Sequence, residues 1–111
     1  MLLEPLLRQT AQGHAEDLAA HQMIDHNGSD GATYTQRLDR VGYPYQLRGE
    51  NIAAGFKTPQ EVLFMWTEGD ENPSGPHRLN MLNCQHTEAG VGLSYSADAY
   101  PYWVLDMASR R

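Results

Sequence analysis

The strongest constraint on the fold is a regular alternation of side chains near the end of the chain. Every second residue from 89 to 95 is larger than its neighbours: Ala89, Val91, Leu93 and Tyr95 alternate with Gly90, Gly92 and Ser94. Successive side chains of a β-strand point to opposite faces, so a period of two predicts a strand. A second apolar run at 102–107 follows a turn near 97–100, and the two runs predict an antiparallel hairpin. The two glycines share one face, which indicates that another element packs closely there.

The first part of the chain has a helical period instead. Leu7, Ala11, His14 and Leu18 follow one another at steps of four, three and four residues, which places them on one side of a helix. This pattern predicts an amphipathic helix over about residues 3–23. Because His14 lies on the apolar side, we expect a core histidine with one hydrogen-bonded ring nitrogen rather than a ligand.

Further helix signals follow. Thr33 or Thr35 can begin a second helix, which Gly42 would end. Residues 58–61, Thr-Pro-Gln-Glu, combine an N-cap, a proline at the first helical position and the glutamate of a capping box. A short helix is expected within 74–82. Helices followed by a hairpin predict an α+β fold, with helices on the faces of a small antiparallel sheet.

Length and charge restrict the class of protein. The 111 residues suffice for one domain, and 41% hydrophobic content supplies one core, in which we expect Trp66 to be an anchor. A formal net charge of -6 argues against nucleic acid as a partner, because its phosphates would be repelled. No run is long and apolar enough to form a transmembrane segment. The lone Cys84 cannot form an internal disulfide.

The stretch from Arg48 to Gly55 is the first candidate for chemistry. Glu50 lies between two glycines, Gly49 and Gly55, which can adopt backbone angles that other residues avoid. We therefore expect bends at both ends of the stretch and a carboxylate fixed between them. The alternative is that Glu50 pairs with Arg48 or caps a nearby turn.

Seven fragments stand in an order that is typical of one protein family. They are residues 11–20, His26 before a glycine-rich turn, Gly49-Glu50-Asn51-Ile52-Ala53, Trp66 after Thr58-Pro59, His77-Arg78-Leu79-Asn80-Met81-Leu82, Gly90-Val91-Gly92 and Tyr102-Trp103-Val104. In this order they resemble the CAP superfamily of cysteine-rich secretory, antigen 5 and pathogenesis-related proteins, in its compact bacterial form. The resemblance implies a three-layer α-β-α sandwich with a central antiparallel sheet. It also implies a single CAP (SCP-like) domain over residues 1–111, with a third strand near Arg48 to Ala53.

The resemblance further implies a cleft lined by two histidines and two acidic residues. By their places in the fragments, His26 and His77 match the histidines and Glu50 matches one acid. The other acid follows Trp66 in the family, which indicates Glu68. The segment from Trp66 to His77 is longer here than in the compact bacterial pattern, so Glu71 is the alternative.

Such a cleft is compatible with three functions. His26 and His77 could hold a divalent metal such as zinc, with carboxylates orienting the imidazoles. If the protein is an enzyme, His26, Glu50, Glu68 and His77 would form the site of a metal-dependent, protease-like hydrolase. The cleft could instead bind a lipid, glycan, peptide or protein, since CAP proteins are known as sterol and lipid binders. Its aromatic rim would be formed by Tyr43, Tyr45, Phe56, Tyr100 and Tyr102. A binding module is ranked first and the hydrolase second.

The cellular location is also inferred from the resemblance. The opening residues lack the basic leader of a secretion signal, and Glu4 and Pro5 interrupt their apolar run. Either the protein stays inside the cell or a signal was removed before this chain was made. The family is chiefly extracellular, so we expect an extracellular or cell-surface protein.

Overall fold

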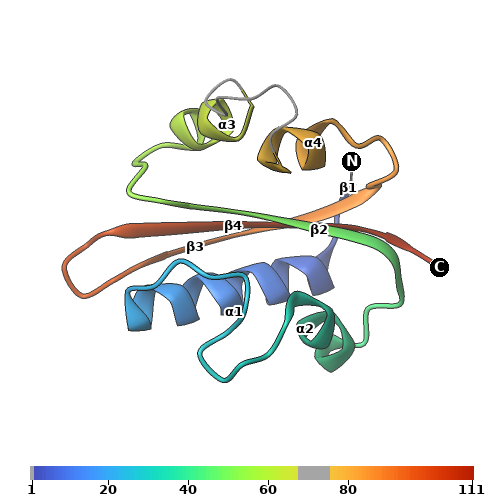
Figure 1. Ribbon diagram of the computed structural model, residues 1–111, viewed down its shortest axis with the longest axis horizontal. Coiled ribbons are helices and arrows are strands. Elements are labelled where there is room, and N and C mark those ends of the chain that lie inside the picture. The colour runs from blue at the N-terminus through green and yellow to red at the C-terminus, as the bar shows by residue number, and fades with distance from the viewer. Residues whose placement is uncertain (1, 68–75) are drawn as a thin grey trace.

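The computed structural model describes residues 2–67 and 76–111, which form three layers (Figure 1). The elements are β1 (Leu2–Leu3), α1 (Pro5–His21), α2 (Tyr34–Val41), β2 (Tyr45–Ala54), α3 (Pro59–Thr67), α4 (Pro76–Leu82), β3 (Glu88–Tyr95) and β4 (Pro101–Arg110). The sheet has the strand order β1-β3-β4-β2. The first two helices cover one face and the last two cover the other (Figure 1). The expected α+β fold is therefore confirmed.

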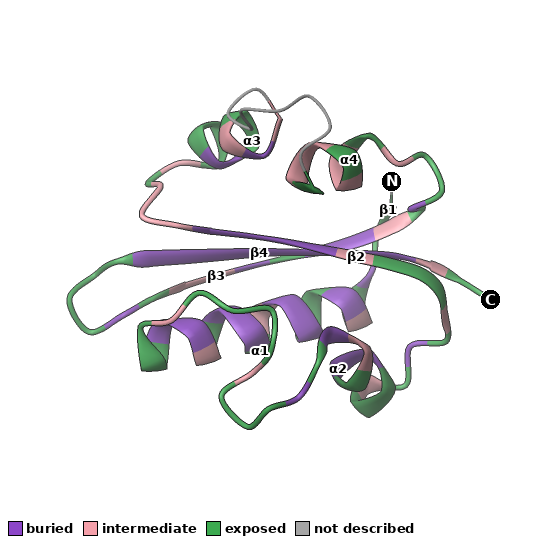
Figure 2. Ribbon diagram, viewed as in Figure 1, coloured by how far each residue is buried: buried purple, intermediate pink, exposed green. Residues whose placement is uncertain are grey.

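The predicted hairpin forms the centre of the sheet. Strands β3 and β4 are antiparallel, with Glu88 opposite Ala108 and Tyr95 opposite Pro101. On its other side β4 pairs with β2, which is the third strand expected near Arg48 to Ala53. Residues 101–108 of β4 are all buried, because this strand has neighbours on both edges and helices over both faces (Figure 2).

The sheet departs from the expected antiparallel pattern at its other edge. Leu2 and Leu3 form a short strand parallel to β3, although Leu3 was expected to begin the first helix. The helix begins only at Pro5, because proline favours the first helical position and the Glu4 carboxylate accepts a hydrogen bond from the Leu7 N–H at 2.9 Å. The four-stranded sheet is consequently mixed.

Helix α1 lies directly on β3, as the two glycines of that strand predicted. A Cβ atom on Gly90 would overlap the backbone of Leu7 and Arg8, and one on Gly92 would overlap the backbone of Ala11. Figure 2 shows the buried side of α1 facing the sheet. Glycine is required at both positions because any side chain would push the helix off the strand.

The other helices begin and end at the local signals in the sequence. Thr33 and Gln36 form a reciprocal capping box at the start of α2, and Gly42 ends the helix with a φ of 76°. In α3 the Thr58 hydroxyl accepts a hydrogen bond from the Glu61 N–H at 3.2 Å. Trp66 is buried, and its indole N–H donates to the Ile52 carbonyl oxygen at 3.1 Å. The prediction of a tryptophan core anchor is confirmed.

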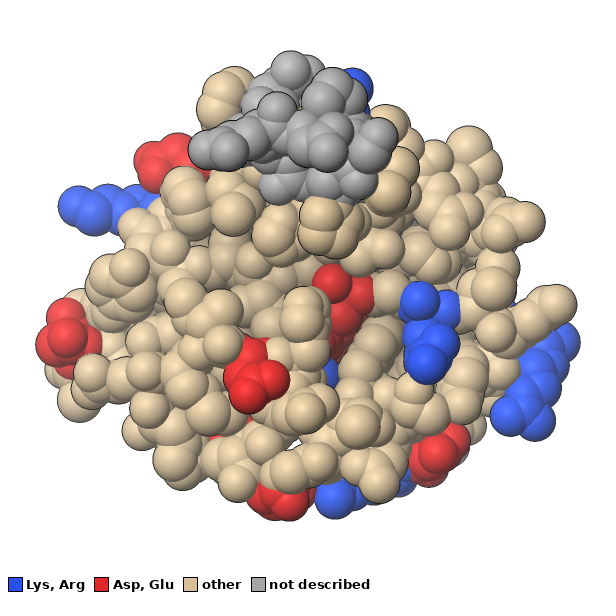
Figure 3. Space-filling model, viewed as in Figure 1, with Lys and Arg blue, Asp and Glu red and all other residues tan. Residues whose placement is uncertain are grey.

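The surface carries charges of both signs. On the face shown in Figure 3, acidic and basic side chains are interspersed rather than gathered into a patch of one sign. Over residues 2–67 and 76–111, no helix combines the length and apolar character needed to cross a bilayer.

Candidate functional site

Glu50 lies in the middle of the edge strand β2, and the predicted bend at Gly49 is wrong. Gly49 is paired with Met107 inside the sheet. A Cβ atom there would lie 2.9 Å from both Asn80 Oδ1 and His86 Cε1, so these two side chains would have to shift to admit a larger residue. Gly55, with a φ of 88°, does follow the end of the strand. Strand register, rather than a pair of bends, therefore fixes the Glu50 carboxylate.

Arg37 of α2 binds this carboxylate in a two-pronged geometry. Its Nη1 donates to Glu50 Oε2 at 2.9 Å and its Nη2 to Glu50 Oε1 at 3.0 Å. Such paired hydrogen bonds fix the orientation of a carboxylate as well as its position. Arg48, the partner considered from the sequence, instead donates from Nε to Thr35 Oγ1 at 2.6 Å. The Arg48 alternative is therefore wrong.

His26 contacts Glu50 from the loop between α1 and α2. The Nδ1 atom lies 2.9 Å from Glu50 Oε1, while the Glu50 side chain is 2% exposed and that of His26 is 58% exposed. The hydrogen bond to Glu50 raises the pKa of His26, although partial burial opposes the shift. In the neutral ring, a proton on Nδ1 that bonds to Glu50 leaves Nε2 with the lone pair. His26 is thus an oriented imidazole with an accessible ring.

The loop that carries His26 is tied to the helices at two consecutive carbonyl groups. Arg37 Nη2 donates to the His26 carbonyl oxygen at 2.8 Å. His14 Nε2 donates to the carbonyl oxygen of Asp25, the residue before His26, at 2.7 Å. His14 is fully buried, and burial followed by the nearby Arg37 charge lowers its pKa. The predicted core histidine with one bonded nitrogen is confirmed, and it also holds the loop.

Behind Glu50 lies a second carboxyl group, Asp106, which is fully buried in β4 directly opposite Glu50. Its Oδ2 lies 2.7 Å from Thr10 Oγ1 and 3.7 Å from Arg37 Nη1. Burial, followed by the neighbouring Glu50, raises the pKa of Asp106 well above its usual range. Burial alone would also raise the pKa of Glu50, but hydrogen bonds with Asp106, His26 and Arg37 outweigh it and lower that pKa to about 2.

Arg37, Asp106 and Thr10 were not among the residues expected from the sequence. Two signals were present. Asp106 interrupts the apolar run at 102–107. Arg37 stands at helical spacing between Tyr34 and Val41, and so falls on the apolar side of α2. A charged side chain in a buried pattern indicates a paired charge, because an unpaired buried charge is very costly.

His77 lies on the opposite side of β2, in the first turn of α4. Its carbonyl oxygen accepts a hydrogen bond from Asn51 Nδ2 at 3.1 Å, and Asn80 Nδ2 donates to Asn51 Oδ1 at 2.9 Å. Glu50 and Asn51 are neighbours in a strand, so their side chains point to opposite faces. Glu50 thereby contacts Arg37 of α2 and Asn51 contacts His77 of α4, in the helical layers on opposite faces of the sheet (Figure 1).

The His26 side chain thus contacts Glu50 directly, whereas the His77 backbone carbonyl binds the side chain of Asn51, the next residue of the same strand. Glu68 and Glu71, the candidates for the second acid, lie outside the described residues. Over residues 2–67 and 76–111, no three His, Cys, Asp or Glu side chains are grouped as they would be around a metal ion. The assignment of His26 and His77 as metal ligands therefore stays a prediction.

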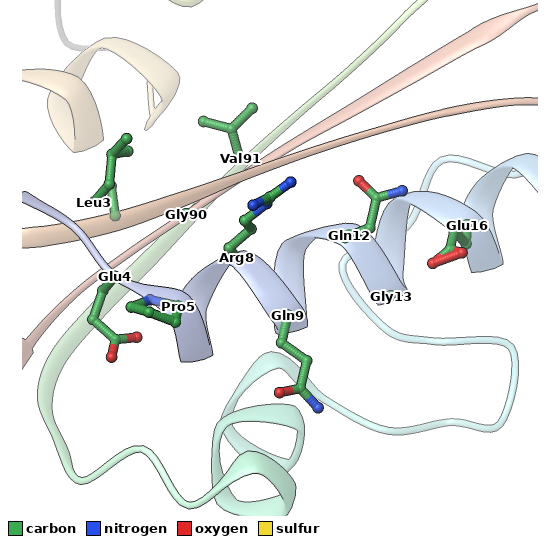
Figure 4. Close-up of a pocket in the computed structure, with 11 residues that line it drawn as sticks. Leu3, Glu4, Pro5, Arg8, Gln9, Gln12, Gly13, Glu16, Gly90 and Val91 are labelled. Carbon is green, nitrogen blue, oxygen red and sulfur yellow. The ribbon is translucent and has the colours of Figure 1, made fainter.

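The aromatic rim is not formed as expected, because Tyr43 and Tyr102 are buried in the core. A hollow of about 850 Å³ lies away from the predicted cleft, between α1 and the edge of β3 beyond its short pairing with β1 (Figure 4). Arg8 and Gln12 point from the helix toward this edge (Figure 4). The Gln12 amide accepts from the Leu93 N–H and donates to the Leu93 carbonyl oxygen, both at 3.0 Å, and so takes the place of a neighbouring strand.

Sequence comparisons agree with the resemblance. A sequence profile described as "CAP: Cysteine-rich secretory protein family" matches residues 4–107. The Bacillus subtilis protein YkwD is 33% identical over 90 residues, which cover 81% of this chain and 33% of YkwD. The Bacillus subtilis membrane protein YlbC is 29% identical over 85 residues, or 77% of this chain and 23% of YlbC. The chain therefore spans a third or less of these curated relatives.

Two solved structures share the fold over the whole chain. One is an extracellular protein containing a SCP domain from Bacillus anthracis, with a TM-score of 0.79 and 29% identity, of which this chain covers 34%. The other is an outer surface protein from Borrelia burgdorferi, with a TM-score of 0.85 and 22% identity, of which this chain covers 78%. At that identity the second likeness concerns the fold alone.

Proposed function

Because this chain belongs to the CAP family of cysteine-rich secretory proteins, we propose that it is a binding module with its site at the edge of β2. The observation that carries the proposal is the 2.9 Å contact between His26 Nδ1 and a Glu50 carboxylate that Arg37 holds in place. A partly exposed imidazole oriented by a buried carboxylate has its other nitrogen available for a ligand. Lipids, glycans and peptides are the ligand classes that the family resemblance suggests.

A divalent metal such as zinc would add a positive charge for a ligand oxygen to bind. The donor chemistry suits zinc, because a metal-bound histidine usually donates its second ring N–H to a carboxylate, as His26 can to Glu50. His26 and His77 would supply the two imidazoles. With two protein ligands from the described residues, we expect weaker binding than at structural zinc sites with four.

The same contact supports hydrolysis as a second candidate, because a carboxylate that orients a histidine is also an arrangement that activates water. The two functions differ in their response to one substitution. His77→Ala should abolish a metal-dependent hydrolysis, whereas a groove that binds a lipid or peptide by its apolar surface should keep its ligand.

We further propose an extracellular or cell-surface location for this protein. The Bacillus anthracis structure is described as an extracellular protein and the Borrelia burgdorferi one as an outer surface protein. Fractionation of cells that express the full-length natural protein tests this location. Recovery in the cytoplasmic fraction alone would contradict it.

Calorimetric titration with zinc tests the site. We expect binding at about pH 7.5 and its loss at about pH 5.5, because histidine, with a usual pKa of about 6.5, cannot ligate a metal once protonated. His26→Ala and His77→Ala should each weaken binding, and the double variant should abolish it. His21→Ala is the matched control, since His21 is an exposed histidine that bonds to Asp17 instead. Equal binding by the double variant and the parent would remove the metal-binding proposal.

A further inference from the structure

The buried cluster behind His26 contains two carboxyl groups and one cation. Glu50 and Asp106 face each other across β2 and β4, and their side chains are 2% and 0% exposed. The Arg37 guanidinium makes both of its short contacts, at 2.9 and 3.0 Å, with Glu50. Its Nη1 lies 3.7 Å from Asp106 Oδ2. Arg37 therefore neutralises Glu50, and an ionised Asp106 would add an uncompensated charge in the interior.

The hydrogen atoms around Asp106 lead to the same conclusion. Thr10 Oγ1 lies 2.7 Å from Asp106 Oδ2 and 2.9 Å from the Leu7 carbonyl oxygen, but a hydroxyl has only one hydrogen to donate. Asp106 Oδ1 is buried and receives no hydrogen bond. An ionised carboxylate in this place would thus accept at most one shared hydrogen bond, far fewer than a buried charge requires.

Among the described residues, the other titratable groups near Asp106 supply no cation to it. His26 can be charged, but its hydrogen bond is with Glu50. From α1, His14 has a pKa lowered first by its burial and then by Arg37, which favours the neutral ring. From α2, the Tyr34 hydroxyl donates to the Met107 carbonyl oxygen at 3.1 Å, and burial raises the pKa of Tyr34. Both groups are neutral at physiological pH.

We propose that Asp106 carries a proton in the folded protein and shares it in a hydrogen bond with Glu50, the residue directly opposite on β2. The cluster of Arg37, Glu50 and Asp106 then has no net charge. Glu50 accepts hydrogen bonds from Arg37, Asp106 and His26, so its carboxylate is held from three sides. Asp106 is a positioning residue that acts on His26 through Glu50. The inference rests on the proposed role of the His26–Glu50 pair, and burial also raises the pKa of Asp106, in agreement with it.

The substitution Asp106→Asn tests the proton directly. An asparagine has nearly the shape of a protonated aspartic acid and can still donate a hydrogen bond to Glu50. The parent must take up a proton at Asp106 when it folds above about pH 4, the usual pKa of aspartate, whereas the variant takes up none. The unfolding constant of the parent, relative to that of Asp106→Asn, should therefore rise by about tenfold per pH unit between about pH 5 and the raised pKa of Asp106.

Urea denaturation of both proteins at several pH values measures this ratio. Asp30→Asn is the matched control, since Asp30 is an exposed aspartate paired with Arg40 and is ionised in both folded and unfolded chains above about pH 5. Its ratio to the parent should be independent of pH in that range. If Asp106 is ionised in the folded protein, the ratio for Asp106→Asn will also be flat, and the inference is overturned.

A second measurement serves if the asparagine variant fails to fold. The infrared spectrum of the folded parent at neutral pH should contain the C=O stretching band of a protonated carboxylic acid, which disappears on thermal unfolding. Absence of this band overturns the inference.

The zinc titration separates this inference from the proposed function. If the ratio of unfolding constants is independent of pH but zinc binds, the protonated Asp106 is wrong and the metal site stands. If the ratio depends on pH as expected but the parent binds no zinc, the metal site is wrong and the protonated Asp106 stands.

Discussion

Arg37 occupies a place on α2 where the helical spacing otherwise brings apolar side chains inward. Its side chain is 10% exposed and crosses the face of the Tyr34 ring, with the guanidinium carbon 5.2 Å from the ring centroid. From there it binds Glu50 and the carbonyl group of His26 together. One side chain therefore sets the distance between the loop before α2 and the edge strand, and so the orientation of the His26 ring.

The pKa of His26 is the observable that reports this orientation. We expect NMR titration to give a value above the usual 6.5 or so in the parent. Because the folded pKa is higher than that of the unfolded chain, protonation of His26 favours the folded state. This contribution is fully present below about pH 6.5 and is lost as the pH rises through the folded pKa.

In Glu50→Gln the pKa of His26 should fall to about 6.5 or lower, because the negative charge is removed while partial burial remains. The His21 ring, which bonds to Asp17 elsewhere, gives an internal reference signal. A pKa of His26 that is the same in parent and Glu50→Gln would show that Glu50 does not act on the ring.

At the scale of helices and strands, the close contact between α1 and β3 should control stability. Gly92→Ala adds a methyl group that overlaps the Ala11 backbone, so we expect the free energy of unfolding to fall by about 1–3 kcal/mol or more. Gly13→Ala is the matched control, because Gly13 is in α1 and its Cβ position has no atom within 4 Å. It should stabilise the protein by about 0.5–1 kcal/mol. Urea denaturation measures both changes, and a Gly92→Ala protein as stable as its parent would contradict the described packing.

Local signals and long-range contacts explain which elements could be predicted from the sequence. Helix α2 was predicted from Thr33 and Gly42, since a cap depends only on residues within one turn. The hairpin was predicted because alternation is also local. Strand β1 was missed because two leucines have no period, and they pair with residues more than eighty positions away. Family resemblance indicated Glu50 and His26. Their partners Arg37 and Asp106 were missed because these contacts also join residues far apart in the sequence.

At the scale of the whole molecule, β2 brings the two helical layers to one edge of the sheet. The side chains of Glu50 and Asn51 point to opposite faces, and each binds a segment with a candidate histidine: Glu50 binds the loop at His26, and Asn51 binds α4 at His77. On the visible face, acidic atoms lie in the hollow between the layers (Figure 3). The edge strand thereby binds both histidine-bearing segments, one on each face of the sheet.

The most direct test of this account is whether His26 and His77 respond to the same bound ion. Zinc is added in steps to isotope-labelled protein at about pH 7.5, above the usual histidine pKa of about 6.5, and the imidazole NMR signals are followed. The account predicts that the signals of His26 and His77 change together with one dissociation constant, while the His21 signal does not change at those concentrations. If the two histidines respond with different dissociation constants, or only one of them responds, they do not form a single site across the edge of β2.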